Sequence, residues 1–255
     1  MRIPGKYIRV SWVAFVVITI LALIGTVARR KSGEIKDIIV NVKQIGSDEH
    51  EMLNATDVTK ILDNAMGSEI KGSYIKHLDL GRVEQILEEN PSVSNAEAFI
   101  NGKNELEITI MPREPILRVI DNRGGNYFLD PKGTQMPTSR LYTPRVLVVT
   151  GNVPIYLAGF LDKDKGLMKD IFNLAKKIGD DGFMADMIEQ IHITNVGEIV
   201  LVPQVGKQKI LFGDAENVEE KFKNLLAFYK EGMPYSGWNK YNVIDVRFKG
   251  QVVCR

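Results

Sequence analysis

Cysteine is nearly absent from this chain, since Cys254 is the only one among 255 residues. An internal disulfide and a multi-cysteine metal cluster are therefore excluded. Histidine is scarce as well, with three residues and no spacing between them that suits a metal ion. The body of the chain also lacks a basic excess, because the 27 basic and 32 acidic side chains after residue 31 give a net charge of −5. A nucleic-acid-binding face needs clustered positive charge and is not expected, and neither a metal nor a cofactor is predicted.

Long apolar runs are missing too, apart from one near the N-terminus. Residues 10–28 (VSWVAFVVITILALIGTVA) carry no charge, and about 20 apolar residues cross the hydrocarbon core of a bilayer as a helix. A cleaved signal peptide is the alternative, but its apolar region is usually shorter. The run predicts an uncleaved single-pass transmembrane helix, with a tail at 1–9 and a linker at 29–36. Three basic residues flank each side of it, so charge alone leaves its direction open.

The next stretch predicts one strand and two helices. Residues 38–45 (IIVNVKQI) are rich in β-branched residues, which is typical of a strand. A first helix is expected to begin after Asn54 and to end at Gly67, and a second to begin after Asp79. The second ends at Asn90, because Pro91 disfavours helical geometry in the residue before it. The predicted inward faces are Val58, Ile61, Leu62 and Ala65 in the first helix, and Leu80, Val83, Ile86 and Leu87 in the second.

Two strands follow, at 93–100 and 106–111, with a turn at 101–104 rich in Asn and Gly. Leu106, Ile108 and Ile110 alternate with polar residues and should face the core. Pro112 and Pro115 cannot donate ladder hydrogen bonds and mark the end of the pairing. The predicted order over 37–120 is β-α-α-β-β.

This order, with the stretch ENPSVSNAEAFINGKNELEITIMPREPI at 89–116, is similar to a POTRA domain. More particularly, it resembles the bacterial cell-division family FtsQ/DivIB. The segment NYFLDPKGTQMP at 126–137 resembles the Tyr-x-Leu-Asp-x-x-Gly hairpin that opens the β domain of that family. The segment TPRVLVVTG at 143–151 resembles the strand that follows, although Thr143 stands where leucine is usual.

The resemblance implies an architecture and a role. It implies a cytoplasmic N-terminus, one inner-membrane helix, a periplasmic POTRA domain at 37–120 and a β domain at 121–255. The implied role is that of a non-catalytic scaffold at the division septum, which links early and late division proteins. The implied partners are FtsB and FtsL, held beside the septal peptidoglycan synthase FtsW/FtsI, with FtsK as a further contact.

The second half, taken by its own patterns, predicts an α+β unit of antiparallel hairpins with two helices. The first helix has an apolar face over residues 167–178, and the second over residues 218–229. Strands are expected at 188–194, 198–202, 207–212 and 242–248, and Lys249-Gly250 turns the chain into the final QVVCR.

A catalytic alternative is a membrane-anchored, sortase-like transpeptidase with Cys254 as nucleophile and His192 as its partner. Arg255 is adjacent to Cys254, and consecutive strand residues point to opposite faces, so this arginine would face away from the thiolate. The sequence before the cysteine also lacks a sortase-like Thr-Leu-x-Thr. The scaffold interpretation is therefore preferred.

The last strand, 242–248, is expected to offer a free edge that can accept a strand from a partner. The resemblance implies that this strand, with the helix before it, is the dock for FtsB. Ile244, Val246 and Phe248 are expected to face the core. The alternative is that QVVC merely closes the sheet. The candidate partner-binding residues are Tyr229, Tyr235, Val243, Asp245, Arg247 and Val252.

Overall fold

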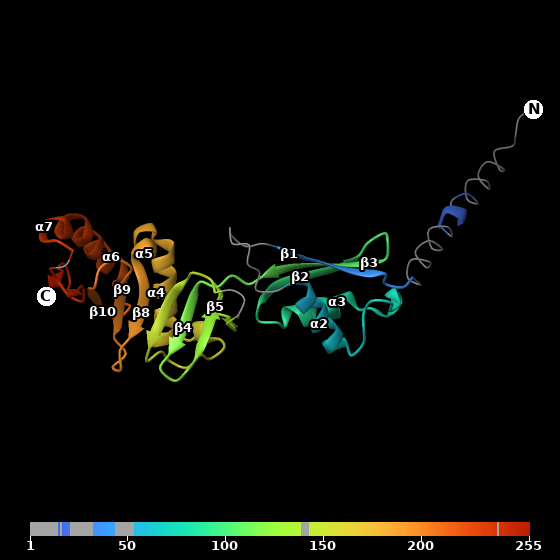
Figure 1. Cartoon of the computed structure of the whole chain (residues 1–255), viewed down its shortest axis with the longest axis horizontal. Coiled ribbons are helices and arrows are strands. Elements are labelled where there is room, and N and C mark those ends of the chain that lie inside the picture. Colours follow the sequence, from blue (N-terminus) through green and yellow to red (C-terminus); the bar gives the residue numbers. More distant parts are fainter. Residues whose placement is uncertain (1–14, 16, 21–32, 44–53, 139–142, 239) are drawn as a thin grey trace, which may run out of the picture. The chain divides into compact units, whose positions relative to one another are not determined.

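The computed structural model describes residues 15, 17–20, 33–43, 54–138, 143–238 and 240–255 (Figure 1). The chain divides into two compact units, Met1–Pro112 and Arg113–Arg255. The predicted tail at 1–9, most of the predicted span at 10–28 and residues 29–32 of the linker lie outside the described residues, although 15 and 17–20 are helical. In the part of the chain that is described, no helix has both the length and the apolar character that crossing a membrane requires.

The first unit has the predicted order of elements. They are β1 (Asp37–Val42), α2 (Ala55–Met66), the short 3-10 helix η1 (Ile75–His77), α3 (Leu80–Glu88), β2 (Val93–Ile100) and β3 (Glu105–Pro112). The three strands form one sheet in the order β1-β3-β2, with β1 parallel and β2 antiparallel to β3. Figure 1 shows α2 and α3 together on one side of this sheet.

The helix ends of this unit follow from local chemistry, as predicted. The side chain of Asn54 accepts a hydrogen bond from the backbone N–H of Asp57 at 2.9 Å, and Asp79 accepts one from Arg82 at 3.2 Å. Gly67 ends α2 in the left-handed conformation, with φ of +68°. The prediction that Ala65 faces the core is wrong, because its side chain is exposed at the end of α2.

The core of the first unit lies between these helices and the sheet. It contains Val58 and Leu62 of α2, Val83, Ile86 and Leu87 of α3, and Leu106, Ile108 and Ile110 of β3. The alternation predicted for β3 is thus confirmed. A bulge shifts the register of β2 between Val93 and Asn95.

The second unit is built on a sheet of nine strands, in the order β12-β11-β10-β9-β8-β7-β4-β5-β6. The strands are β4 (Leu117–Asp121), β5 (Asn126–Leu129), β6 (Gln135–Met136), β7 (Leu147–Gly151), β8 (Ile188–Ile193), β9 (Ile199–Pro203), β10 (Lys209–Gly213), β11 (Val243–Asp245) and β12 (Val253–Cys254). The predicted domain division at 120/121 falls inside β4, which belongs to this sheet.

The helices of the second unit explain a correction to the predicted pairing. They are η2 (Phe160–Asp162), α4 (Leu167–Asp180), α5 (Gly182–Met187), α6 (Val218–Ala227), η3 (Phe228–Gly232) and α7 (Met233–Ser236). The pairs β7–β8 and β10–β11 are parallel, as is β4–β7, whereas antiparallel pairing was predicted. A connection between adjacent parallel strands must cross over the sheet, and α4 and α6 are the crossovers of the first two pairs. The two predicted helices are confirmed, while the short α5 and α7 were not predicted.

One apolar core fills the space between the sheet and these helices. Ile171, Leu174 and Ile178 of α4 and Phe222 and Leu225 of α6 are buried against inward side chains of the strands. Strands β10, β11 and β12 form one end of this sheet, and the candidate site lies there.

Candidate partner-binding edge of the second unit

The outermost strand at the C-terminal end of the sheet is β12, not the predicted strand 242–248. β11 covers only Val243–Asp245 and lies between β10, to which it is parallel, and β12, to which it is antiparallel. Phe248 lies beyond the end of β11 and is 43% exposed, so the prediction that it faces the core is wrong. The final segment closes the sheet over β11 and becomes its free edge.

The hydrogen-bond pattern shows which backbone groups of β12 point outward. Val243 and Arg255 exchange both N–H···O bonds, each at 3.0 Å. Cys254, opposite Ile244, is the next residue of this antiparallel ladder, and such residues alternate between facing their partner strand and facing away. The N–H and C=O groups of Cys254 therefore face away from β11, and by the same alternation those of Val252 do too.

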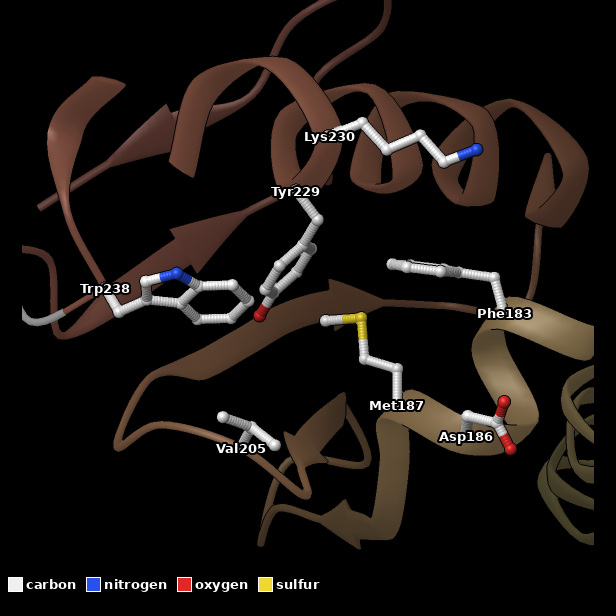
Figure 2. A pocket seen from close by; sticks show the side chains of 7 residues that line it. All are labelled: Phe183, Asp186, Met187, Val205, Tyr229, Lys230 and Trp238. Atoms are coloured by element: carbon white, nitrogen blue, oxygen red, sulfur yellow. The ribbon is translucent and has the colours of Figure 1, made fainter. Parts of the chain in front are cut away.

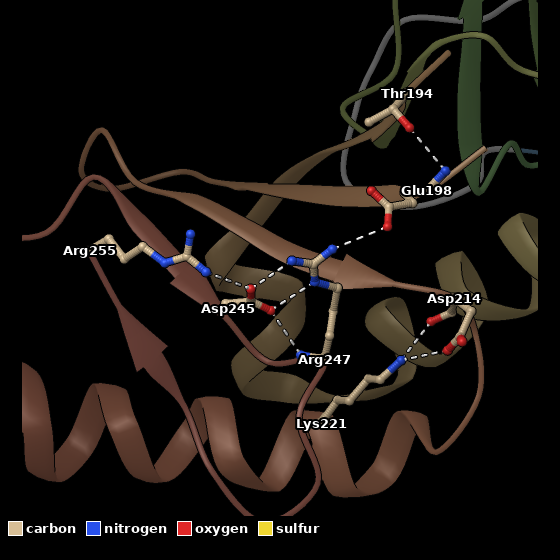
Figure 3. Close-up of polar contacts among 7 residues, drawn as sticks. All are labelled: Thr194, Glu198, Asp214, Lys221, Asp245, Arg247 and Arg255. Carbon is tan, nitrogen blue, oxygen red and sulfur yellow. Dashed lines mark hydrogen bonds and ion pairs between the residues drawn. The ribbon is translucent and has the colours of Figure 1, made fainter. Parts of the chain in front are cut away.

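A buried carboxylate, that of Asp245, belongs to β11, the strand that pairs with β12. Asp245 is fully buried, and its carboxylate accepts hydrogen bonds from Arg247 Nε at 2.9 Å and from an Arg247 terminal nitrogen at 2.8 Å. Arg255 lies 3.7 Å from the same carboxylate, and Arg247 also bonds Glu198, the residue before β9, at 3.1 Å (Figure 3). The hydrogen bonds from Arg247 hold the pKa of the Asp245 carboxyl below its ordinary value, despite burial.

This cluster ties three strands together across the sheet edge. Asp245 belongs to β11, Glu198 borders β9, and Arg255 follows β12. The stem of Arg247 passes over Gly213, where an added Cβ would lie 3.0 Å from the arginine side chain. Gly213 also has a φ of +80°, so both the space and the backbone favour glycine there.

An apolar cavity of about 330 Å³ opens beside this end of the sheet (Figure 2). Its walls come from α5, from the turn after β9 and from the helices after β10, and they carry Phe183, Asp186, Met187, Val205, Tyr229, Lys230 and Trp238. The rings of Tyr229 and Trp238 lie 5.8 Å apart. Such a small, mostly apolar cavity suits an aromatic or aliphatic side chain better than a charged group.

The predicted partner-binding residues lie in different environments. Tyr235 on α7 is 93% exposed, and the Arg247 side chain is 34% exposed, with its guanidinium paired to Asp245 and Glu198. Val243 and Val252 are half-buried. Asp245 and Tyr229 are buried, and burial raises the pKa of the Tyr229 phenol. Asp245 therefore supports the edge from within, and Tyr229 forms part of the cavity wall.

The alternative that pairs Cys254 with His192 finds no support in this geometry. His192 lies on β8, four strands from β12, which corresponds to roughly 19 Å across the sheet. Its ring nitrogen Nδ1 lies 2.9 Å from the hydroxyl of Thr150. Burial raises the pKa of the Cys254 thiol, whereas a nucleophilic cysteine needs a lowered one.

The structure joins two sequence motifs, MPREP at 111–115 and NYFLDPKG at 126–133, and this contact was not predicted. Arg113, in the segment MPREP, donates to the carboxylate of Asp130 at 2.7 Å, and Asp130 also accepts from the backbone N–H groups of Lys132 and Thr134. Asp130 is almost fully buried, so the arginine neutralises a carboxylate that shapes the β5–β6 turn. At the motif glycine Gly151, with φ of +93°, an added Cβ would collide with the carbonyl oxygen of Ile193.

Comparison with known proteins supports the family resemblance of the second unit. The model of the family described as FtsQ/DivIB, C-terminal related, matches residues 114–255, which is the second unit almost from end to end. No curated protein matches the chain. FtsQ/DivIB proteins form a non-enzymatic family that acts in cell division through interactions with other division proteins. With more than half of its length matched and the family's motifs in contact, this chain belongs to the FtsQ/DivIB family of bacterial cell-division proteins.

Proposed function

We propose that this protein is a non-catalytic scaffold of the division septum that docks the FtsB/FtsL pair on its C-terminal strand edge. In this proposal, residues 10–28 anchor the chain in the inner membrane, with residues 1–9 in the cytoplasm and both units in the periplasm. The first unit is a POTRA domain, as its β-α-α-β-β order supports. FtsK and the synthase FtsW/FtsI are further partners in the same assembly.

The observation that carries the docking proposal is the outward-facing backbone of β12. Cys254 presents an N–H and a C=O group that no other strand of the described sheet pairs with. A partner strand can add to such an edge through main-chain hydrogen bonds, and side-chain pockets then supply specificity. Tyr235 is exposed on neighbouring α7 and is available for side-chain contacts, and the partly exposed Arg247 lies beside the same edge.

Proline at position 252 tests this mode of binding. Val252→Pro removes an outward-facing N–H without changing β11, whereas Val252→Ala keeps the N–H and trims only the side chain. With the purified FtsB/FtsL pair, we expect Val252→Pro to weaken binding about tenfold or more, the loss expected for one or two main-chain hydrogen bonds. Val252→Ala should bind within a few-fold of the parent. A folded Val252→Pro variant with parental affinity would show that the docking edge lies elsewhere.

The proposed orientation has its own test. An alkaline phosphatase fused after Arg255 should be active, because that enzyme requires the oxidising periplasm. A cytoplasm-only reporter at the same position should be inactive. The opposite pattern would contradict the proposed localisation without bearing on the strand edge.

A further inference from the structure

The strand β2 is an outer strand of the sheet in the first unit, and α3 packs against it. The N–H of Asn101 donates to the carbonyl oxygen of Glu105 in the hairpin that joins β2 to β3, so the odd-numbered residues of β2 bond β3. The even-numbered residues, which include Ala96 and Ala98, direct their N–H and C=O groups away from β3. An unoccupied row of such groups would be open to the addition of another strand.

Two carboxylates from α3 occupy the N–H groups of this row. The N–H of Ala98 donates to Glu84 at 2.8 Å, and the N–H of Ala96 donates to Glu88 at 3.3 Å. Glu84 is half-buried. A hydrogen bond from a backbone N–H to a carboxylate is charge-assisted and is stronger than one between neutral groups. Each bond therefore satisfies a donor that an added strand would otherwise use.

The geometry of the helix and the strand explains why both contacts form. The short turn at 89–92 joins α3 to β2, and the two elements run in opposite directions, so the later glutamate meets the earlier alanine. Four residues of helix rise about 6 Å, and two residues of strand advance about 6.8 Å. Glu84 and Glu88 thus lie on one face of α3 at nearly the spacing of Ala96 and Ala98. Because like charges one turn apart disfavour a helix, helix stability alone does not explain this pair.

We propose that Glu84 and Glu88 form a built-in block that keeps the β2 edge of the first unit from accepting a strand. The two carboxylates compete with any incoming strand for the N–H groups of Ala96 and Ala98, and a strand adds only by displacing them. A change that withdraws the carboxylates from β2 opens the edge. The proposal does not depend on the docking of FtsB/FtsL at β12.

Hydrogen exchange at single amides of the full chain tests whether the carboxylates occupy the edge. Glu84→Ala should speed exchange at Ala98 about tenfold, and Glu88→Ala should do the same at Ala96, as expected for the loss of one hydrogen bond. Glu89→Ala is the matched control, because Glu89 forms a surface ion pair instead and should leave both amides unchanged. If either variant sped up both amides equally, together with those of β3, the effect would be a general loss of stability, and the assignment would be overturned.

Self-association of the purified full chain tests the block itself. With alanine in place of both Glu84 and Glu88, the opened edge can pair with the same edge of a second molecule, and sedimentation velocity should show association about tenfold tighter than that of the parent, or more. The variant with glutamine at both positions removes the same charge but keeps an acceptor oxygen at each, so it should stay within a few-fold of the parent.

Two results of this comparison would overturn the proposal. One is an alanine variant that associates no more than the parent although its Ala96 and Ala98 amides exchange rapidly, because the open edge would then accept no strand. The other is a glutamine variant that associates as strongly as the alanine variant, because the loss of charge, and not the release of the N–H groups, would then explain the association.

Discussion

Replacing Asp245 with asparagine should lower the free energy of unfolding of the second unit by about 2 to 3 kcal/mol. The Asp245 carboxylate is fully buried and receives two hydrogen bonds from the Arg247 guanidinium. Hydrogen bonds to charged groups contribute about 1.5 to 3 kcal/mol each. Asparagine keeps one acceptor oxygen, and the Arg247 side chain is 34% exposed, so water can hydrate part of its charge. The loss should therefore stay below the roughly 3 to 5 kcal/mol of a completely buried broken pair.

Urea unfolding followed by tryptophan fluorescence measures this loss. The chain has two tryptophans, so Trp12→Phe leaves Trp238 as the reporter of the second unit. Glu219→Gln is the control, because it removes a carboxylate from an ion pair with Lys177 on the surface, and it should have no measurable effect. A value for Asp245→Asn within about 0.5 kcal/mol of the parent, the range of ordinary surface substitutions, would refute the assigned role.

The pH dependence of the same variant gives an independent check. The pKa of Asp245 is lower in the folded protein than its ordinary value of 3.8, so the folded state binds fewer protons than the unfolded state near that pH. The stabilisation from this ion pair is complete above the pKa that Asp245 has in the unfolded chain. It is lost as the pH falls through the pKa that Asp245 has in the folded protein. The difference between parent and Asp245→Asn should thus be constant near neutral pH and should shrink in acid. A difference unchanged down to about pH 3 would contradict the ion pair as its source.

Three further outcomes are expected. Ile86→Asp places a charge in the core of the first unit and should lower its free energy of unfolding by about 3 kcal/mol or more. The loss should appear as faster hydrogen exchange in α3 and β2. Unaltered exchange would mean that this face of α3 is not buried. Burial raises the pKa of Tyr127 to about 12, so the folded state holds its proton longer and the second unit should lose stability as the pH rises above about 10. Tyr127→Phe should flatten that alkaline loss in urea titrations. Because burial raises the pKa of Cys254, iodoacetamide should alkylate the folded chain more slowly than the unfolded one, and equal rates would contradict the burial.

Much of the first unit could be predicted from local signals. Asn54, Gly67 and Asp79 mark helix ends through hydrogen bonds within a few residues, and the alternation in β3 identifies its buried face. Ala65 misled the prediction because an apolar position at the end of a helix fits the pattern even where no other element covers it.

The strand that forms the sheet edge and the bounds of β11 could not be predicted, because both depend on contacts between residues that are far apart in the sequence. The segment 242–248 alternates as an ordinary strand would, but pairing with β10 and β12 limits β11 to Val243–Asp245. The sequence placed Asp245 among the candidate partner-binding residues, but its carboxylate is buried and paired with Arg247. The contact between Arg113 and Asp130 likewise joins motifs 17 residues apart.

Hydrogen exchange at the Cys254 amide tests the docking edge most directly. In the free protein this N–H faces away from β11 and should exchange rapidly, as an unpaired group does. When the FtsB/FtsL pair is added to the full chain, a strand that adds to β12 should protect the Cys254 amide, while the N–H of Arg255, already bonded to Val243, should change little. A complex that forms while Cys254 continues to exchange at its free rate would contradict docking on this strand.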